Sequence, residues 1–301
     1  MAYIEIPNLT KDYGRGRGIF DVNLSVERGE VFGFAGINGA GKTTTIRHLM
    51  GFLKPQAGTA TIAGMDCWKD SAKIKHLVGY VPGEIAFPDD GTGTQFLKRQ
   101  MAMQGKEDMA YCKALCDRFQ LDSSAPLKSM SKGMKQKTAI IAAFVCRPDI
   151  LILDEPATGL DPLMRDIFLA LVQEQKARGC TVFMSSHILE EMERTCDRVA
   201  LIRDGRIATV ANMNDIRHNE NKSFKSEFKD KECFDRFLAL GYECTCVKTE
   251  ELQLVVNLRD SEIGKLMTDL ATYNVLFFKE IKHSLEEYFH AIFKEGHTHA
   301  E

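Results

Sequence analysis

The segment that most constrains the fold is glycine-rich and lies between an apolar run and a helical run. Gly36-Ile37-Asn38-Gly39-Ala40-Gly41-Lys42-Thr43 has the spacing GxxxxGK[ST]. The preceding run VFGFA (31–35) predicts a buried strand, and Thr44 to Met50 predicts a helix that ends before Gly51. Glycines let backbone N–H groups converge on phosphate oxygens, and the helix N-terminus attracts the same anion. The segment therefore predicts a phosphate-binding loop in an α/β domain.

This loop assigns chemistry to single residues. We expect Lys42 to reach the β- and γ-phosphates of a nucleotide and the Thr43 hydroxyl to ligate magnesium. Six further residues are expected to surround the phosphates, namely Gly36, Asn38, Gly39, Ala40, Gly41 and Thr44. The alternative, a flexible turn with a chance lysine, does not explain why a strand precedes the loop and a helix follows it.

A second motif is ILILDEP, residues 150–156. Its four aliphatic residues predict a strand buried on both faces, as in a parallel sheet. Asp154 is then placed to hold magnesium through water, and Glu155 to act as general base for an attacking water. An ordinary strand that ends in an acidic turn is the alternative, but it leaves the phosphate loop unexplained.

Two more segments carry polar residues at the ends of predicted elements. Ser131, in SMSKGMKQ (129–136), is expected to cap a long apolar helix, and the free N–H groups after it form a second anion site. TVFMSSH (181–187) predicts a strand that delivers His187 at its carboxyl end. Taken alone, each residue is more often structural than functional.

In this order, over about residues 3 to 215, the segments resemble the ATP-binding subunits of ABC transporters. The resemblance implies a P-loop NTPase core with an N-terminal antiparallel β part and a helical subdomain. It also implies a magnesium aspartate, a catalytic glutamate, a switch histidine and an aromatic residue stacked on adenine, matched here by Asp154, Glu155, His187 and Tyr13. Ser131 and Gly133 match the signature loop, and Asp161 matches the loop that crosses the dimer contact.

The resemblance further implies ATP and Mg²⁺ as cofactors and a head-to-tail dimer, either homodimer or heterodimer. One chain's phosphate loop and the other chain's signature loop would hold each ATP. It implies a separate transmembrane permease and a peripheral position on the cytoplasmic face of the membrane. The signature loop and the loop at 80–84 are most similar to subunits that export drugs, antimicrobial peptides or lipid-like substrates.

Three alternatives to a transport ATPase differ in what they require. A soluble small-molecule kinase would lack the signature loop and His187. A soluble ABC protein that acts on ribosomes or DNA usually carries two ATPase units or large insertions. A non-hydrolysing regulatory subunit stays open because Gly83, in Tyr80-Val81-Pro82-Gly83-Glu84, stands where the family has glutamine. Glu84, next to it, is a second candidate magnesium ligand.

The signature loop also departs from the family pattern. Lys132 stands where the family usually has glycine, and Met134 where it usually has glutamine. Ser131 and Gly133 are retained, so the helix cap and the close backbone approach are still expected.

The chain of 301 residues has room for about two domains. We predict an ATPase domain at 1–218, with strands at 3–30 around a turn at 14–18, helices at 85–147 and a hairpin turn at Asp204-Gly205. Residues 219–301 predict a C-terminal α+β domain in the order βαββαβ, of ferredoxin-like type, followed by a last helix from Ser284.

The composition limits which partners and which cellular location the sequence predicts. The net charge of −3 supports no general attraction to nucleic acid, and the nine cysteines, without a C-x-x-C pair, are expected to be reduced thiols. The start MAYIEIPNLTKD lacks the pattern of a secretory signal, and the longest apolar run, 138–146, is too short to span a bilayer. His297 and His299 are expected to be solvated.

Overall fold

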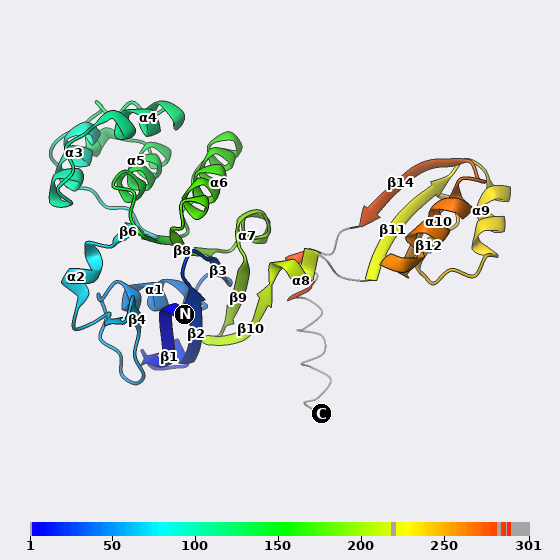
Figure 1. The fold of residues 1–301 in the computed structure, drawn as a ribbon, viewed down its shortest axis with the longest axis horizontal. Coiled ribbons are helices and arrows are strands. Elements are labelled where there is room, and N and C mark those ends of the chain that lie inside the picture. The colour runs from blue at the N-terminus through cyan, green and yellow to red at the C-terminus, as the bar shows by residue number, and fades with distance from the viewer. Residues whose placement is uncertain (1, 218–220, 282–283, 287, 290–301) are drawn as a thin grey trace. The chain divides into compact units, whose positions relative to one another are not determined.

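The computed structural model describes residues 2–217, 221–281, 284–286 and 288–289 (Figure 1). It divides the chain into two compact units, residues 1–213 and 214–301. The predicted boundary after residue 218 falls on 218–220, outside the described residues. Within those residues, no helix is both long enough and apolar enough to cross a membrane.

A six-stranded sheet forms the centre of the first unit, in the order β10-β9-β3-β8-β7-β6. The strands are β3 (Val31–Ala35), β6 (Val78–Val81), β7 (Ile150–Asp154), β8 (Thr181–Ser186), β9 (Arg198–Arg203) and β10 (Arg206–Asn212). All neighbours pair in parallel except β10 with β9. Every residue of β3, β7 and β8 is buried, which explains their continuous apolar sequences.

Three of these strands lead directly into the predicted motifs. The phosphate loop joins β3 to α1 (Lys42–Leu49), β7 ends next to Glu155, and β8 ends next to His187. Because β3, β8 and β7 are adjacent and parallel, their carboxyl ends lie at one edge of the sheet. The two predicted strands before Glu155 and His187 are therefore confirmed, and the sheet brings both residues to the phosphate loop.

A second sheet packs on this core. It has the order β2-β1-β4-β5, formed by β1 (Ala2–Asp12), β2 (Gly18–Glu27), β4 (Thr61–Ile62) and β5 (Met65–Asp66), all antiparallel. Ile4 and Val22 from this sheet share one hydrophobic cluster with Phe32, Phe183 and Ile202 from the central sheet. The predicted N-terminal antiparallel part is confirmed, with its turn at residues 13–17.

The helical subdomain consists of α3 (Gly93–Met103), α4 (Ala110–Arg118), η1 (Leu127–Ser129) and α5 (Lys132–Phe144), grouped in Figure 1. The prediction of helix from residue 85 was wrong for 85–92. Gly91 has φ +88°, and Thr92 forms a capping box with Gln95, so the helix begins only at Gly93. The remaining helices of the first unit are α2 (Ser71–Lys75), α6 (Pro162–Ala177), α7 (Leu189–Thr195) and, at the boundary, α8 (Met213–Arg217).

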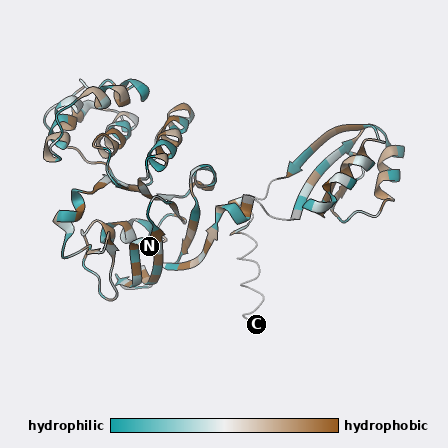
Figure 2. Ribbon diagram, in the orientation of Figure 1, coloured by the Kyte–Doolittle hydropathy of each residue, from teal (hydrophilic) through white to brown (hydrophobic). Residues whose placement is uncertain are grey.

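The second unit has the strand and helix order expected from the sequence. It runs β11 (Asn221–Phe228), α9 (Lys231–Leu238), β12 (Cys244–Lys248), β13 (Gln253–Arg259), η2 (Asp260–Glu262), α10 (Ile263–Leu270) and β14 (Val275–Ile281). The antiparallel sheet has the order β12-β13-β11-β14. Leu254, Val256 and Leu258 alternate with more exposed residues along β13, so one face of the sheet is covered (Figure 2). The ferredoxin-like assignment stays a prediction.

The predicted last helix is only partly described. Leu285 and Phe289 are buried. Residue 287 and the two tail histidines, His297 and His299, lie outside the described residues.

The turn at Asp204-Gly205 connects three parts of the first unit. Both residues have positive φ, 50° and 75°, as a tight hairpin requires. The Gly205 N–H donates to the Ala40 carbonyl in the phosphate loop, and its carbonyl accepts from the Phe20 N–H in β2. A Cβ at Gly205 would lie 2.4 Å from the Gly18 carbonyl oxygen.

We expect Gly205→Ala to lower the free energy of unfolding of the first unit by about 2 to 5 kcal/mol, from backbone strain plus the clash. Gly179→Ala is the matched control, because Gly179 also has positive φ but its added Cβ would meet no atom within 4 Å. This control should lose only about 1 to 2 kcal/mol. Trp68, the single tryptophan, lies in the first unit, so urea unfolding followed by its fluorescence measures both. Equal losses would contradict the role of the Gly205 contacts.

Candidate functional site

The phosphate loop needs glycine for two reasons. Gly39 and Gly41 have φ of +84° and +116°, in the region that side chains rarely adopt. A Cβ at Gly36 would lie 2.6 Å from the Ile202 carbonyl oxygen, and one at Gly41 would lie 2.7 Å from Ile19 Cγ2. The loop backbone is therefore packed against β2 and β9 while its tip, residues 37–39, is exposed.

Lys42 is held inside this loop. Its side chain is 5% exposed, and Nζ donates to the carbonyls of Gly36 (2.6 Å) and Ile37 (3.2 Å). The same ammonium lies 3.0 Å from Glu155 Oε1. Thr43 and Thr44, half-buried, follow in the first turn of α1. The Lys42 charge is thus placed at the loop and shared with the carboxylate after β7.

Asp154 is completely buried at the end of β7. Its Oδ1 accepts from Ser185 Oγ at 2.6 Å, and Ser185 Oγ accepts from the Glu155 N–H at 3.0 Å. Asp154 Oδ2 has no hydrogen-bond partner among the described residues. A buried carboxylate oxygen without a partner is costly, and a hydrated Mg²⁺ ion is the hard cation that such an oxygen binds. Asp154 and the Thr43 hydroxyl therefore fit a magnesium ion.

Ser185 is a residue of this site that the sequence interpretation missed. It joins Asp154 to the backbone of Glu155, and the signal was its place two residues before His187 at the end of a buried strand. Nearby, burial and the Asp154 carboxylate raise the pKa of Tyr80 to about 12, so this phenol stays neutral.

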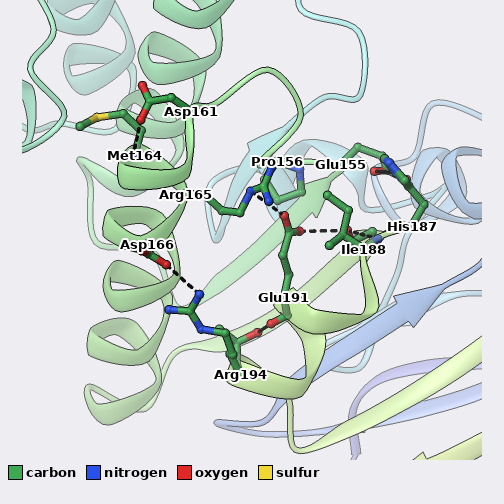
Figure 3. A network of polar contacts seen from close by, with 12 residues as sticks. Glu155, Pro156, Asp161, Met164, Arg165, Asp166, His187, Ile188, Glu191 and Arg194 are labelled. Atoms are coloured by element: carbon green, nitrogen blue, oxygen red, sulfur yellow. Dashed lines mark hydrogen bonds and ion pairs between the residues drawn. The ribbon is translucent and has the colours of Figure 1, made fainter. Parts of the chain in front are cut away.

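Glu155 lies between two cationic or basic groups. Its Oε2 is 2.6 Å from His187 Nδ1, and its Oε1 faces Lys42. The backbone of Glu155 has φ +50°, a left-handed conformation that is strained for a residue with a side chain. His187 is 45% exposed, so it is open to a ligand while Glu155 is held (Figure 3).

The predicted signature residues lie at a different helix start. Ser131 caps α5, as predicted, since its Oγ accepts from the Met134 N–H at 3.2 Å. A Cβ at Gly133 would lie 3.4 Å from the Gly159 carbonyl oxygen. Gln136, buried further along α5, donates through Nε2 to the Pro156 carbonyl at 2.6 Å. Helix α5 is therefore tied to the segment that follows Glu155.

Two other predicted residues have local contacts. Asp161 caps α6 by accepting from the Met164 N–H at 2.9 Å. Tyr13 is half exposed, its N–H donates to the Arg17 carbonyl, and Lys11 Nζ lies 5.7 Å from its ring. Among the described residues, neither of them nor Ser131 has a polar contact with Lys42, Glu155 or His187.

The chain is similar to known proteins of one family. Residues 19–158 match the family model described as ABC transporter. The chain is 37% identical over 197 residues to the ABC transporter ATP-binding protein NatA of Bacillus subtilis, covering 64% of this chain and 80% of the relative. The chain belongs to the ATP-binding proteins of ABC transporters.

Two further ABC proteins extend the comparison. The Nod factor export ATP-binding protein I of Burkholderia orbicola is 36% identical over 211 residues, covering 68% of this chain and 69% of that protein. A solved ATP-binding subunit of an ABC transporter superposes with a TM-score of 0.66 at 33% identity, covering 71% of this chain and 92% of the other. As an ABC family member, the chain is an ATPase with ATP and Mg²⁺ as cofactors and a P-loop NTPase fold.

Gly83, where the ABC family has glutamine, is in contact with Asp154. A Cβ at this position would lie 2.8 Å from Asp154 Oδ2 and 3.1 Å from its Cγ. The atom that a side chain at position 83 would approach most closely is therefore Asp154 Oδ2, which has no hydrogen-bond partner among the described residues. Glu84 is exposed and begins the segment that leads away from the sheet.

We expect Gly83→Ala to raise the magnesium concentration for half-maximal ATP turnover by about tenfold, because its methyl group displaces Asp154 Oδ2. Glu84→Ala is compared in the same magnesium titration. A higher midpoint in Glu84→Ala assigns that carboxylate to magnesium, and an unmoved midpoint leaves water as the ligand. A midpoint equal to wild type in Gly83→Ala would contradict the role of the contact with Asp154.

Proposed function

We propose that this chain hydrolyses ATP within a head-to-tail dimer and thereby drives a separate transmembrane permease. The observation that carries the proposal is Glu155, held between Lys42 and His187 next to the orphaned oxygen of Asp154. A general base needs such a position, with its orientation set by neighbours on rigid strands. A regulatory subunit without hydrolysis would not need this arrangement.

The residues act in a simple order. When ATP binds, Lys42 leaves its carbonyl partners and Glu155 and binds the β- and γ-phosphate oxygens. This exchange is favourable because the phosphates carry more negative charge than one carboxylate. Glu155 then accepts a proton from the water that attacks the γ-phosphorus, and the bond from that phosphorus to the β-phosphate oxygen breaks. His187 donates to a γ-phosphate oxygen and steadies the group. Thr43 and Asp154 would hold magnesium, which would neutralise charge on the phosphate oxygens.

The dimer is proposed from the position of Ser131. Helix α5 of 13 residues presents N–H groups at its start, beside an exposed serine hydroxyl. Within the described part of the chain, this anion site makes no polar contact with Lys42, so we assign it to the nucleotide of a second subunit, identical or related. Gly133 and Asp161 belong to the same exposed region, and Tyr13 is assigned to the adenine.

A groove of about 630 Å³ is proposed to receive the permease. It lies between the central sheet and the helical subdomain, and its walls include Phe52, Tyr80, Ile85, Phe87 and Phe96. Ile85 and Phe87 follow Gly83, which contacts Asp154, so a helix seated there adjoins the magnesium site. The chain would then act at the cytoplasmic face of a membrane as a peripheral subunit. Its substrate is proposed to be a drug, an antimicrobial peptide or a lipid-like molecule, and the Nod factor export relative supports the direction of export.

The catalytic assignment predicts the behaviour of Glu155→Gln. This variant should bind ATP normally but lose about 10²- to 10⁴-fold in turnover, because amide nitrogen and oxygen do not accept the water proton. It should also accumulate as an ATP-bound dimer, measured by size-exclusion chromatography with and without ATP. Unchanged turnover together with a monomer in ATP would reject the assignment.

The shared site predicts a different result for Ser131→Arg. Bulk and charge at the start of α5 should block dimer formation and abolish hydrolysis, while the ATP affinity of the monomer stays within about twofold of wild type. Fluorescent nucleotide titration measures that affinity. A large loss of affinity in the monomer would place Ser131 in its own chain's pocket and exclude the head-to-tail arrangement.

The permease assignment is tested separately. The 301-residue chain, purified from its native membranes without high salt, should bring down one polytopic membrane protein. Phe87→Glu in the groove should release it, whereas Phe277→Glu, an exposed aromatic residue in the second unit, should not. Retention by the Phe87 variant would reject the groove as the docking site.

A further inference from the structure

A buried carboxylate is hydrogen-bonded to Ser186, the residue before His187. Glu191, in α7, is 2% exposed. Its Oε2 accepts from Ser186 Oγ at 2.9 Å, and Ser186 Oγ accepts from the Ile188 N–H at 3.0 Å. Because residues 186 and 188 flank His187, this chain of hydrogen bonds fixes the backbone on both sides of the histidine.

The other oxygen of Glu191 faces α6. Arg165 Nε lies 3.3 Å from Glu191 Oε1, and the Arg165 N–H donates to the Asp161 carbonyl at the start of α6 (Figure 3). Neither Arg165 Nε nor Glu191 Oε1 has a hydrogen-bond partner among the described residues. A closer approach of α6 would convert this ion pair into a hydrogen-bonded pair.

Burial supports a specific function for this carboxylate. Burial raises the pKa of Glu191, and the nearby Glu155 acts in the same direction, whereas Ser186, Arg165 and His187 lower it. A buried carboxylate is costly unless its partners compensate, so a simple packing position would favour an apolar residue. The groups that compensate Glu191 come from the His187 segment and from α6.

We propose that Glu191 is a positioning residue that orients His187 toward Glu155 and, through Arg165, makes this orientation depend on α6. Asp161, in the segment assigned to the dimer contact, caps the start of α6. The inference rests on the proposed function, because it concerns how His187 is set for ATP hydrolysis. It links dimer closure to the geometry of the catalytic centre.

The chain offers a matched control for this contact. Arg194 Nη1 pairs with Asp166 Oδ1 at 2.7 Å and also joins α7 to α6. Both side chains are about half exposed, 47% and 58%, so solvent weakens the pair. Asp166→Asn removes a contact between the same helices without touching Ser186 or His187.

The test is a double-mutant cycle on steady-state ATP turnover. Glu191→Ala should lower kcat by about 10- to 100-fold, because it misplaces a catalytic group, while the ATP affinity stays within about twofold. In a His187→Ala background, Glu191→Ala should cost less than about twofold more, since Glu191 acts only through His187. Arg165→Gln should lower kcat in the same direction, and Asp166→Asn should leave it unchanged.

The outcomes separate this inference from the proposed function. A wild type without turnover rejects the proposed function. If the wild type is active and His187→Ala is slow, two results overturn the role of Glu191. One is a double variant whose loss of kcat equals the product of the two single losses. The other is a Glu191→Ala variant with wild-type kcat. If Glu191→Ala does not fold, Glu191→Gln replaces it, since its amide oxygen still accepts from Ser186 but it has no charge for Arg165. Its kcat must then equal that of Arg165→Gln, and wild-type turnover in Glu191→Gln overturns the proposal.

Discussion

The site depends on the register of three adjacent parallel strands, β3, β8 and β7. Ala35 is paired with Ser186, and Asp154 with Ser185, so the three strands end at the same level of the sheet. Each strand is buried on both faces, which makes a slip of register costly. The phosphate loop, Glu155 and His187 therefore meet because apolar strands hold them in place, and no contact among the polar residues has to create that arrangement.

The polar residues at this edge compensate one another in a continuous set. Lys42 pairs with Glu155, Glu155 with His187, and Asp154 with Ser185, while Glu191 holds the segment around His187. In a region of low dielectric these contacts are stronger than in water, and unpaired members are expensive. Asp154 Oδ2, a buried carboxylate oxygen without a hydrogen-bond partner among the described residues, marks where a cation completes the set.

Two of the departures from the family pattern, Gly83 and Lys132, lie at close contacts between segments. Gly83 lies against Asp154, so the space that a side chain would need is taken by the carboxylate. At the signature loop, the stem of Lys132 lies across Gly159, with Cε 3.5 Å from the position of an added Cβ. Gly159, with φ +84°, leaves room for this lysine, and the two loops that precede α5 and α6 are packed together.

The sequence by itself determined the features that depend on a few neighbouring residues. The glycines of the phosphate loop, the cap at Ser131, the turn at Asp204-Gly205 and the apolar strands are local, because each follows from backbone conformation or from continuous burial. The start of the helical subdomain was missed because Gly91 and Thr92 delay the helix after a segment without a clear period. Only the tertiary structure decided the contacts of Ser185, Gly83 and the Arg165–Glu191 pair. Their partners lie 26 or more residues away along the chain, and the order of strands in the sheet, which short-range patterns do not contain, brings them together.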